Sequence, residues 1–416
     1  MTLSVELSGL QAAQTNLDTI GNNIANVGTV GFKGSTPTFA DVYGTSLLGS
    51  AGKNTDPGQG TTTNSLSQLF TEGSISQTGN PLDVAINGNG FFQVQTQTGV
   101  AFTRDGALQL NAGGFLVNDT GALVMGYGAP ASGSTATAAG TLGTIQVSES
   151  NLAAAATTKL TVDLNLPTTD TPINTGTTPF SVTNPNSYNQ STTTTVYDSL
   201  GTPSSLTTFF TQVSGSGSPS QWQTHYELSN SSGAMIASGA GAALTFNSSG
   251  ALTAGSATIN VATLPDGAAP LSIAQNFTGS TLSDLAFGVN SVTNDGSAGG
   301  QFAGVQVASD GNVVAQYSNG STRAMGTIAL ANFENPQGLT AINGNNWLPS
   351  VASGQPVPNM PGTAGLGALE SGALEGSNID LSTQLVNLIV AQQAYQANVQ
   401  GINIDQQDVQ KLLTLQ

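Results

Sequence analysis

Residues 381–416 read LSTQLVNLIVAQQAYQANVQGINIDQQDVQKLLTLQ, and the spacing of their apolar side chains decides the fold. Alternating steps of four and three residues pass through ten positions, which are Leu381, Leu385, Leu388, Gln392, Tyr395, Val399, Ile402, Gln406, Val409 and Leu413. Eight of these ten residues are apolar. This is the heptad period of a coiled coil. The stretch therefore predicts one long amphipathic helix that packs along another helix. Ser377 followed by Asp380 resembles a capping box at its start, with Asp in place of Glu.

The only comparable pattern lies at the opposite end of the chain. The same steps of four and three pass there through Leu3, Leu7, Leu10, Gln14, Leu17, Gly21 and Ile24, and Ile20 and Val27 widen the stripe. The pattern stops in the glycine-rich segment 28–34, which is a normal way for a helix to end. Because the intervening sequence shows no other convincing helix, we expect the N-terminal helix to be the partner of the C-terminal one.

Almost everything between these helices reads as β structure. From Phe91 onward, short runs such as Phe91–Gln95 and Leu108–Leu110 alternate with glycine-containing turn signals, which favours a β-meander. We expect a mainly β chain with terminal α-helices, in which two β-rich domains, one inserted in the other, accompany an N-/C-terminal helical coiled-coil-like domain. The expected divisions are an N-terminal helix in 1–40, a connector in 41–75, the first part of a β-domain in 76–146, an inserted outer β-domain in 147–285, the second part of the first β-domain in 286–350, a connector in 351–376 and the C-terminal helix in 377–416.

The composition excludes several classes of protein. Among 416 residues there are six Lys and Arg against 23 Asp and Glu, a formal net charge of −17, and no cysteine. Without cysteine there is neither a disulfide framework nor a Cys-ligated metal site. The few basic residues are scattered, so nucleic acid and anionic membranes are poor partners, and no apolar run approaches the roughly 18 residues that span a bilayer. With 38% hydrophobic residues, the chain is also too apolar for a low-complexity disordered protein.

Candidate chemical sites have simpler interpretations. His225 is the only histidine, and a strand-surface residue is a better interpretation than a catalytic or metal site. Gly88-Asn89-Gly90 lacks the continuation of a phosphate loop, which favours a hairpin turn. Asp295-Gly296 and Asp310-Gly311 lack the alternating Asp residues of a calcium loop, so turns are favoured there too.

Two carboxylates in the second connector complete the candidates. Glu370 and Glu375 could form a catalytic pair, but a Pro- and Gly-containing connector favours a solvated acidic patch. We therefore expect no catalytic, cofactor-binding or metal-binding residues, no cofactor and no enzymatic activity.

Both ends and the interior resemble one protein family. The segments 17–26 (LDTIGNNIAN) and 31–33 (GFK) resemble the N-terminal signature of the rod/hook axial proteins of the bacterial flagellum, and 370–381 and 387–398 resemble their C-terminal signature. Two interior stretches, VYDSLG at 196–201 and GTIALANF at 326–333, are similar to those of hook subunits specifically, whereas 81–92 is shared with rod proteins. The chain thus resembles the flagellar hook proteins within this family.

The resemblance implies a structural role. It implies a subunit that polymerises into the hook, a flexible tubular universal joint that transmits motor torque from rod to filament and encloses the export channel, with the two helices in an inner tube. The implied partners are further copies of the chain, the distal rod protein, the hook cap protein, the hook–filament junction protein, the hook-length control protein and the flagellar type III export apparatus, with no nucleic acid and no membrane insertion. The implied location is the extracellular hook attached to the basal body. Since the first residues lack a basic segment before an apolar core, we expect export without a cleaved signal peptide.

The residues expected to carry assembly are those of the helix stripes and the family motifs: Leu3, Leu7, Leu10, Leu17, Ile20, Asn22, Asn23, Ile24, Asn26, Gly31, Phe32, Leu381, Leu385, Leu388, Tyr395, Asn398, Val399, Ile402, Val409 and Leu413. A lone terminal helix is marginal in water, so we hypothesise that both ends are largely disordered in the monomer and fold on polymerisation. The alternatives are a distal rod-type axial subunit and a non-flagellar extracellular β-rich adhesin. A secreted hydrolase would need paired carboxylates or a catalytic triad, for which the sequence gives no pattern.

Overall fold

The computed structural model describes residues 2–42, 58–129, 141–214 and 220–414, and the chain divides into two units. The first unit combines residues 1–149, 304–315 and 323–416, and the second combines residues 150–303 and 316–322. The chain is mainly β with a helix at each end, which confirms the predicted fold class. Strand β20 (Gly288–Asn294) belongs to the second unit because it pairs with β11 (Lys159–Pro167), although the sequence pattern had grouped it with the following β run.

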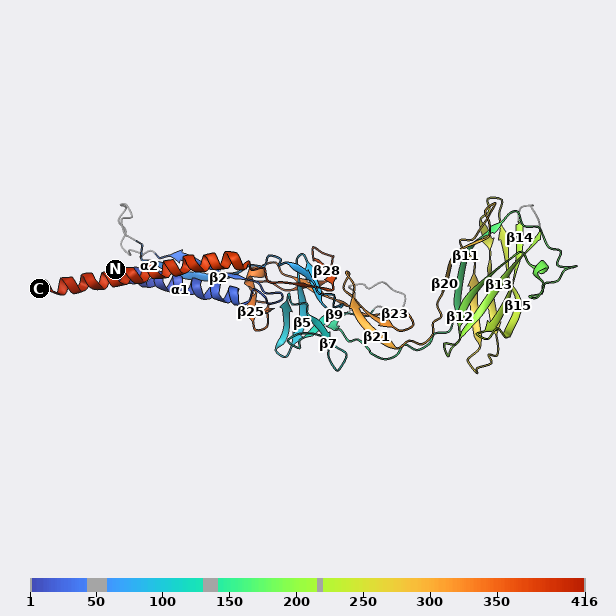
Figure 1. Cartoon of the computed structure of the whole chain (residues 1–416), viewed down its shortest axis with the longest axis horizontal. Helices are drawn as coiled ribbons and strands as arrows, with labels where there is room; N and C mark the ends of the chain where they lie inside the picture. The colour runs from blue at the N-terminus through green and yellow to red at the C-terminus, as the bar shows by residue number, and fades with distance from the viewer. Residues whose placement is uncertain (1, 43–57, 130–140, 215–219, 415–416) are drawn as a thin grey trace. The chain divides into compact units, whose positions relative to one another are not determined.

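The two helices of the first unit, α1 (Thr2–Ala25) and α2 (Leu381–Thr414), lie side by side (Figure 1). They run antiparallel, because Gly9 lies against Asn398 while Gly401 lies against Glu6. No helix in the described part of the chain has the length and hydrophobicity needed to cross a membrane.

The start of α2 is fixed by Asp380. The backbone N–H of Thr383 donates to Asp380 Oδ1 at 2.7 Å, and that of Gln384 donates to the Asp380 carbonyl oxygen at 3.0 Å. Asp380 is therefore the N-cap residue, rather than the second member of a capping box that begins at Ser377. Ser377 instead accepts the N–H of Ile379 through its hydroxyl oxygen at 3.3 Å, in the turn before the helix.

A two-stranded antiparallel hairpin, β1 (Ser35–Asp41) and β2 (Thr61–Gln68), lies along α1. The N–H of Thr61 donates to Ser8 Oγ at 3.1 Å. The segment 41–75, expected as a connector, thus contributes β2 to this hairpin, and its residues 43–57 lie outside the described part of the chain.

The body of the first unit is one 13-stranded sheet with two small two-stranded ladders. Its main path is β21-β22-β23-β9-β5-β6-β26-β25, and β10, β7, β8, β24 and β27 join it. The strands of the sheet are β5 (Phe91–Thr96), β6 (Gly99–Thr103), β7 (Leu108–Leu110), β8 (Leu116–Asn118), β9 (Leu123–Gly128), β10 (Leu142–Thr144), β21 (Phe302–Val307), β22 (Asn312–Tyr317), β23 (Thr322–Ile328), β24 (Leu330–Asn332), β25 (Thr340–Ile342), β26 (Asn346–Leu348) and β27 (Val357–Asn359). A short 3₁₀ turn, Pro336–Gly338, precedes β25.

The two small ladders attach the chain before α2 to the body. In them β28 (Ala368–Ser371) pairs with β4 (Val84–Asn87), and β29 (Ala373–Glu375) pairs with β3 (Ile75–Gln77). The segment 351–376, expected as a connector, is therefore strapped onto the body by strand pairing over its last third. Edge-to-face aromatic rings fill the adjoining core, with Phe102 and Phe333 centroids 4.8 Å apart and Phe91, Trp347 and Phe70 beside them.

The second unit is a sandwich of two sheets. One sheet has the order β12-β13-β14-β15-β16, and the other has β17-β18-β11-β19 with β20 also paired to β11. The strands are β12 (Gln190–Tyr197), β13 (Pro203–Ser214), β14 (Ser220–Asn230), β15 (Met235–Phe246), β16 (Leu252–Ala254), β17 (Ser256–Val261), β18 (Leu271–Asn276) and β19 (Thr281–Ser283), with a 3₁₀ turn at Pro185–Ser187.

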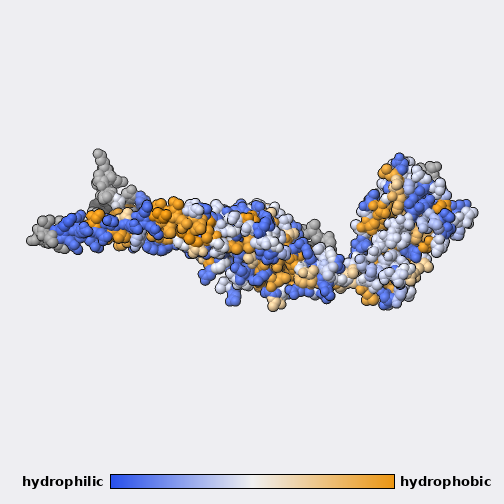
Figure 2. Space-filling view, viewed as in Figure 1, coloured by the Kyte–Doolittle hydropathy of each residue, from blue (hydrophilic) through white to orange (hydrophobic). Residues whose placement is uncertain are grey.

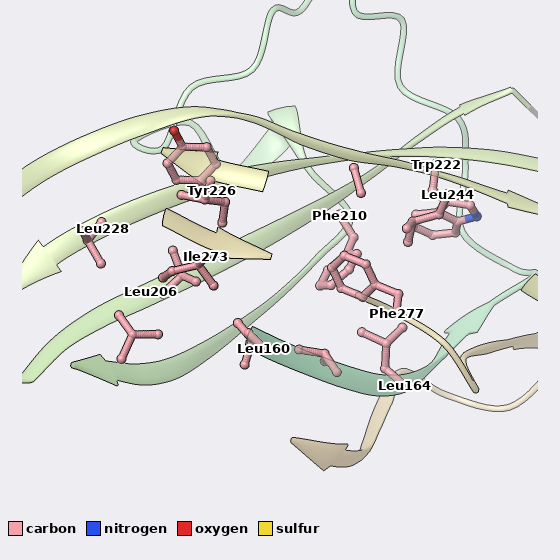
Figure 3. Packing of buried hydrophobic residues seen from close by; sticks show 14 of the residues in the cluster. Leu160, Leu164, Leu206, Phe210, Trp222, Tyr226, Leu228, Leu244, Ile273 and Phe277 are labelled. Carbon is pink, nitrogen blue, oxygen red and sulfur yellow. The ribbon is translucent and has the colours of Figure 1, made fainter. Parts of the chain in front are cut away.

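Side chains that alternate along the strands build the core of this sandwich. On β14, Trp222, Tyr226 and Leu228 point inward while their neighbours are more exposed. They belong to the same buried cluster as Phe210 of β13 and Phe277, which follows β18, and Figure 3 shows these side chains between the strands. Full burial of each such side chain contributes about 1.5–3 kcal/mol, so this unit has a core of its own.

Candidate assembly surface and the junction behind it

The face of α2 that meets its neighbours follows a heptad. Its less exposed positions, spaced by four and three residues, are Gln384, Leu388, Ala391, Tyr395, Asn398, Ile402 and Asp405. The period is the predicted one, but the phase differs. Of the predicted stripe only Leu388, Tyr395 and Ile402 lie on this series.

Small residues explain which face of α2 turns toward α1. A Cβ on Gly9 would lie 2.9 Å from Asn398 Oδ1, and a Cβ on Gly401 would lie 2.7 Å from Glu6 Oε1. Ala391, at 2% exposure, is the most buried residue of α2. The helices therefore approach closely through small and polar residues, and most of the large apolar side chains of α2 are left on other faces.

The remaining apolar residues form what we call the outer apolar face of α2. Its large hydrophobic side chains are between 45% and 61% exposed, and they are Leu385, Val386, Ile389, Val390 and Ile404. Leu381 and Val409 are also exposed, but they continue the inward heptad series by one step at each end. Figure 2 shows apolar surface gathered on the paired helices. Single exposed apolar residues are ordinary, but a helix that is apolar on both faces over its first three turns is typical of a buried helix.

The other residues expected to carry assembly are distributed over both faces. Those at least half covered are Leu10, Leu17, Ile20, Asn23, Ile24, Asn26, Gly31, Phe32 and Val399, together with Leu388, Tyr395, Asn398 and Ile402 of the heptad series. Leu7, Asn22, Leu381, Leu385 and Val409 are exposed. The side chains of Leu3 and Leu413 lie outside the described residues.

Two asparagines of the family motifs hold the helix ends to the hairpin base. The Asn23 side chain donates to the Ser35 carbonyl at 2.8 Å and accepts the Ser35 N–H at 3.0 Å. Asn378 accepts the Gly34 N–H at 2.9 Å and donates to the Leu69 carbonyl at 2.6 Å. The side chains therefore replace strand pairing where the chain leaves one helix and enters the other.

Behind this junction lies a buried ion cluster. Lys33 Nζ is 2.5 Å from Glu375 Oε1, and Arg104 Nη1 is 3.0 Å from Glu375 Oε2. Lys33 also donates to the Thr71 carbonyl at 2.7 Å, and the Gly73 N–H donates to Glu375 Oε1 at 2.9 Å. Burial lowers the pKa of Lys33, and the hydrogen bond and charge of Glu375 oppose that shift. One carboxylate thus ties four chain segments together.

The expectation of a solvated acidic patch is wrong for Glu375, which is 1% exposed. Its cationic partners stand 342 and 271 residues away in sequence, so no local pattern indicates the pairing. Glu370 accepts a hydrogen bond from Gln77 Nε2 at 2.6 Å at the surface. Lys33 and Arg104 are the residues that sequence reasoning missed, and the signal was their rarity among six basic residues.

Gly31 seats the segment after α1 on this cluster. Its φ is +66°, and a Cβ there would lie 2.7 Å from the Arg104 carbonyl carbon. Its N–H donates to the Glu375 carbonyl at 2.8 Å. The close approach and the left-handed backbone both require glycine at this position.

The remaining candidates have structural positions. His225 lies on β14 and stacks on Phe180 with ring centroids 4.0 Å apart, and burial lowers its pKa. The glycines of Gly88–Gly90, both with positive φ, form a bend between β4 and β5, which do not pair with each other, so the expected hairpin turn is not formed.

The two Asp-Gly pairs differ from each other. Asp310-Gly311 forms the expected turn between β21 and β22, with the Gly311 N–H donating to the Ala308 carbonyl at 2.9 Å. Asp295 instead accepts the N–H groups of Thr158 and Lys159, both at 2.8 Å, and so anchors the start of β11. Among the described residues, no group of three or more His, Cys, Asp or Glu side chains could hold a metal ion.

Family models match successive parts of the chain. Residues 3–33 match the "Flagella basal body rod protein" model, and 85–172 match the "Flagellar hook protein FlgE/F/G D1 domain" model. Residues 165–297 match the "Flagellar basal body protein FlaE D2 domain" model, and 370–415 match the "Flagellar basal body rod FlgEFG protein C-terminal" model.

Whole-length relatives agree with these matches. The flagellar hook proteins FlgE of Escherichia coli and Salmonella typhimurium are each 36% identical over 418 residues, covering all of both chains. That of Borreliella burgdorferi is 29% identical over 445 residues, covering 98% of each chain. The crystal structure of Helicobacter pylori flagellar hook protein FlgE2 covers 72% of this chain and all of its own, with a TM-score of 0.55 and 14% identity, and so shares the fold.

Proposed function

The chain belongs to the bacterial flagellar hook protein family, and we propose that it assembles with further copies of itself through the outer apolar face of α2. It is a structural subunit of the hook, in the extracellular part of the flagellum, and the family is a structural one. The single observation that carries the proposal is the exposure of Val386, Ile389 and Val390, at 54% to 61%, on a helix whose opposite face already meets α1.

The occupant of this face is a helix of a neighbouring copy. α1 is covered by both α2 and the β1–β2 hairpin, whereas the side chains of the outer apolar face of α2 are exposed in the described part of the chain. Helices from several copies that surround each α2 would form a tube and bury this surface on all sides. In that tube, Leu385 of the predicted stripe contacts the neighbour, while Leu388 and Ile402 contact α1.

The α1–α2 pair gains most of its stability in the polymer. Its seam relies on Gly9, Ala391 and Asn398, which bury little apolar area, and most helical stability in proteins comes from packing of an apolar face. We therefore expect both helices to be marginally stable and partly frayed in the monomer, and to become fully ordered in the polymer. The β units, which have cores of their own, would stay folded.

The finer role follows from the family. We propose that the tube encloses the export channel, that the polymer transmits torque as a universal joint, and that subunits reach the hook through that channel without a cleaved signal peptide. The proposed partners beyond the chain itself are the distal rod, hook cap, hook–filament junction and hook-length control proteins and the type III export apparatus. The support is the resemblance of both signatures and the full-length similarity to hook proteins.

The test is polymer formation by the purified full chain, followed by electron microscopy and sedimentation. We expect Val390→Glu to abolish or strongly reduce polymer, because the added charge would be buried between copies. Gln407→Glu adds the same charge to an exposed polar part of the same helix and should assemble as well as the parent chain. Glu is a better helix former than Val, so loss of polymer would not come from a weaker helix. Normal polymer from Val390→Glu would contradict the proposal.

A further inference from the structure

A polar cavity of about 310 Å³ lies where the chain leaves α1 and meets the body of the first unit. Asn26, Thr29 and Val30 line it from the segment after the helix, and Asp105, Asp119 and Asn345 line it from the body. All of these residues except Val30 carry an oxygen atom in the side chain, and two of them are carboxylic acids. The hook role leaves this cavity unexplained.

The two carboxyl groups contact each other. Asp105 is 4% exposed, its side chain hydrogen-bonds to that of Asp119, and its Oδ1 accepts the Ala107 N–H at 3.0 Å. Burial, followed by this carboxyl–carboxyl hydrogen bond and the negative charges of Asp119 and Asp83, raises the pKa of Asp105 to about 7. A hydrogen bond between two carboxyl groups requires that they hold one proton between them.

Among the described residues, the charged groups that act on the Asp105 carboxyl are the acidic residues Asp119 and Asp83. Asp119 faces it from the turn after β8, and Asp83 faces it from the segment before β4, where Asn80 Nδ2 donates to Asp83 Oδ1 at 2.9 Å. Arg104 is adjacent in sequence, but its guanidinium binds Glu375 and the Gly88 carbonyl. No Lys, Arg or His is among the residues that line the cavity within the described part of the chain. Loss of the proton would therefore leave two unneutralised charges.

Hydrogen bonds connect Asp105 to the segment after α1. The Asp105 N–H donates to Thr103 Oγ1 at 3.0 Å, and Thr103 Oγ1 donates to the Asn345 carbonyl at 2.8 Å. Asn345 Nδ2 in turn donates to the Val30 carbonyl at 2.9 Å. Gly31 also packs directly on the Arg104–Asp105 peptide bond. A displacement of Asp105 is thus passed to residues 30 and 31.

We propose that Asp105 and Asp119 form a proton-dependent latch, which holds the segment after α1 on the body while the pair shares one proton and loosens that contact when both groups ionise. Two adjacent carboxylates repel each other and draw water into the cavity between the segment and the body. The acidity of the surroundings then sets how firmly the helices are attached. The inference concerns a contact within one chain and holds whether or not α2 mediates assembly.

The experiment uses the full-length soluble chain, labelled with ¹³C at the Asp side chains and titrated from acid to alkaline pH by NMR. Hydrogen exchange of residues 26–31, corrected for the intrinsic rate at each pH, is measured in parallel. We expect one carboxyl resonance to titrate near pH 7 and to be missing in Asp105→Asn. In Asp119→Asn, Asp105 should titrate at clearly lower pH. Protection of residues 26–31 should fall by up to about tenfold for each pH unit between about pH 4 and pH 7 in the parent chain and level off above pH 7, and it should stay constant in Asp105→Asn.

Asp310→Asn serves as the matched control, because Asp310 is an exposed carboxylate in a turn of the same body. This variant should show the same titrating carboxyl resonance and the same pH dependence of protection as the parent chain. A parent chain without a carboxyl that titrates near neutrality, or unchanged pH dependence in Asp105→Asn, would overturn the latch. The same measurement with added calcium at alkaline pH distinguishes a cation site from a proton latch. If calcium restores protection in the parent chain but not in Asp119→Asn, the pair is a cation site and the proton latch is refuted.

Discussion

Lys33 Nζ lies 2.5 Å from Glu375 Oε1 although 342 residues separate the two in sequence, and neither side chain is exposed to solvent. The contact joins the segment that leaves α1 to the strand that leads into α2. Arg104 of the body completes it from the other carboxylate oxygen. The segments next to both helices are therefore bound to one buried carboxylate, which fixes where each helix leaves the body.

Replacing that carboxylate should destabilise the first unit. Glu375→Gln would leave two buried cations without a counter-charge, which typically costs about 3–5 kcal/mol. Urea unfolding followed by circular dichroism should show this loss in the transition of the first unit. Glu370→Gln, the matched change at the carboxylate five residues before Glu375 in the same segment, should stay within about 0.5 kcal/mol of the parent. Equal effects of the two changes would mean that the ion cluster contributes nothing specific.

Two glycines of α1 should respond to different extents to the same substitution. Nothing lies within 4 Å of a Cβ on Gly21, so Gly21→Ala should stabilise the helix in the soluble chain by up to about 1 kcal/mol. A Cβ on Gly9 would meet Asn398 Oδ1 at 2.9 Å, so Gly9→Ala should gain less and Gly9→Val should separate the helices. Thermal melts monitored at the helical band measure both. A larger gain from Gly9→Ala than from Gly21→Ala would contradict the observed seam.

The N-cap assignment of α2 can be tested by a pair of alanine changes. Asp380→Ala removes the acceptor for the Thr383 N–H, so amide exchange at residues 382–384 should become faster. Ser377→Ala removes only the turn contact with Ile379 and should leave these amides unchanged. The hydrogen bond from Thr383 also lowers the pKa of Asp380, so fraying should increase in the parent chain at acidic pH, where the carboxylate accepts less well. Faster exchange in Ser377→Ala alone would restore the capping box predicted from sequence.

The core of the second unit should be independent of the helices. Trp222→Ala removes a fully buried indole and should cost about 3–5 kcal/mol in that unit. Leu200→Ala, at a leucine that is 63% exposed, should have little effect. Calorimetry of the full chain should show one shifted transition while the rest of the unfolding profile is unchanged. A shift of every transition by Trp222→Ala would mean that the two units unfold together.

Sequence alone was sufficient for the periodic features. The heptad spacing from Leu381 predicts α2, and the run Phe91–Gln95 between turn signals predicts the strand β5, because both signals are local. The inward face of α2 was not predicted, because small residues such as Gly9 and Ala391 decide it and hydrophobic patterns give them little weight. The partners of Glu375 and the pairing of β20 with β11 depend on contacts across more than a hundred residues, which single-sequence periodicity does not contain.

The last prediction concerns stability against pH. The pKa of Asp105 is raised to about 7 in the folded chain, whereas an Asp in an unfolded chain has its ordinary pKa of 3.8. A carboxyl with a raised folded pKa stabilises the fold fully below the unfolded pKa, and this contribution is lost as the pH rises through the folded pKa. The parent chain should therefore lose stability between about pH 4 and pH 7, by up to about 4 kcal/mol at about 1.4 kcal/mol per unit.

Asp105→Asn should remove this loss, because the amide is neutral at every pH and can still accept the Ala107 N–H. The variant should equal the parent near pH 4 and exceed it above pH 7, in urea titrations of the first unit at each pH. Asp310→Asn, at an exposed turn, should run parallel to the parent at all pH values. If Asp105→Asn instead destabilises the chain equally at pH 4 and pH 8, the Asp105 carboxyl is ionised throughout and the shared proton does not exist.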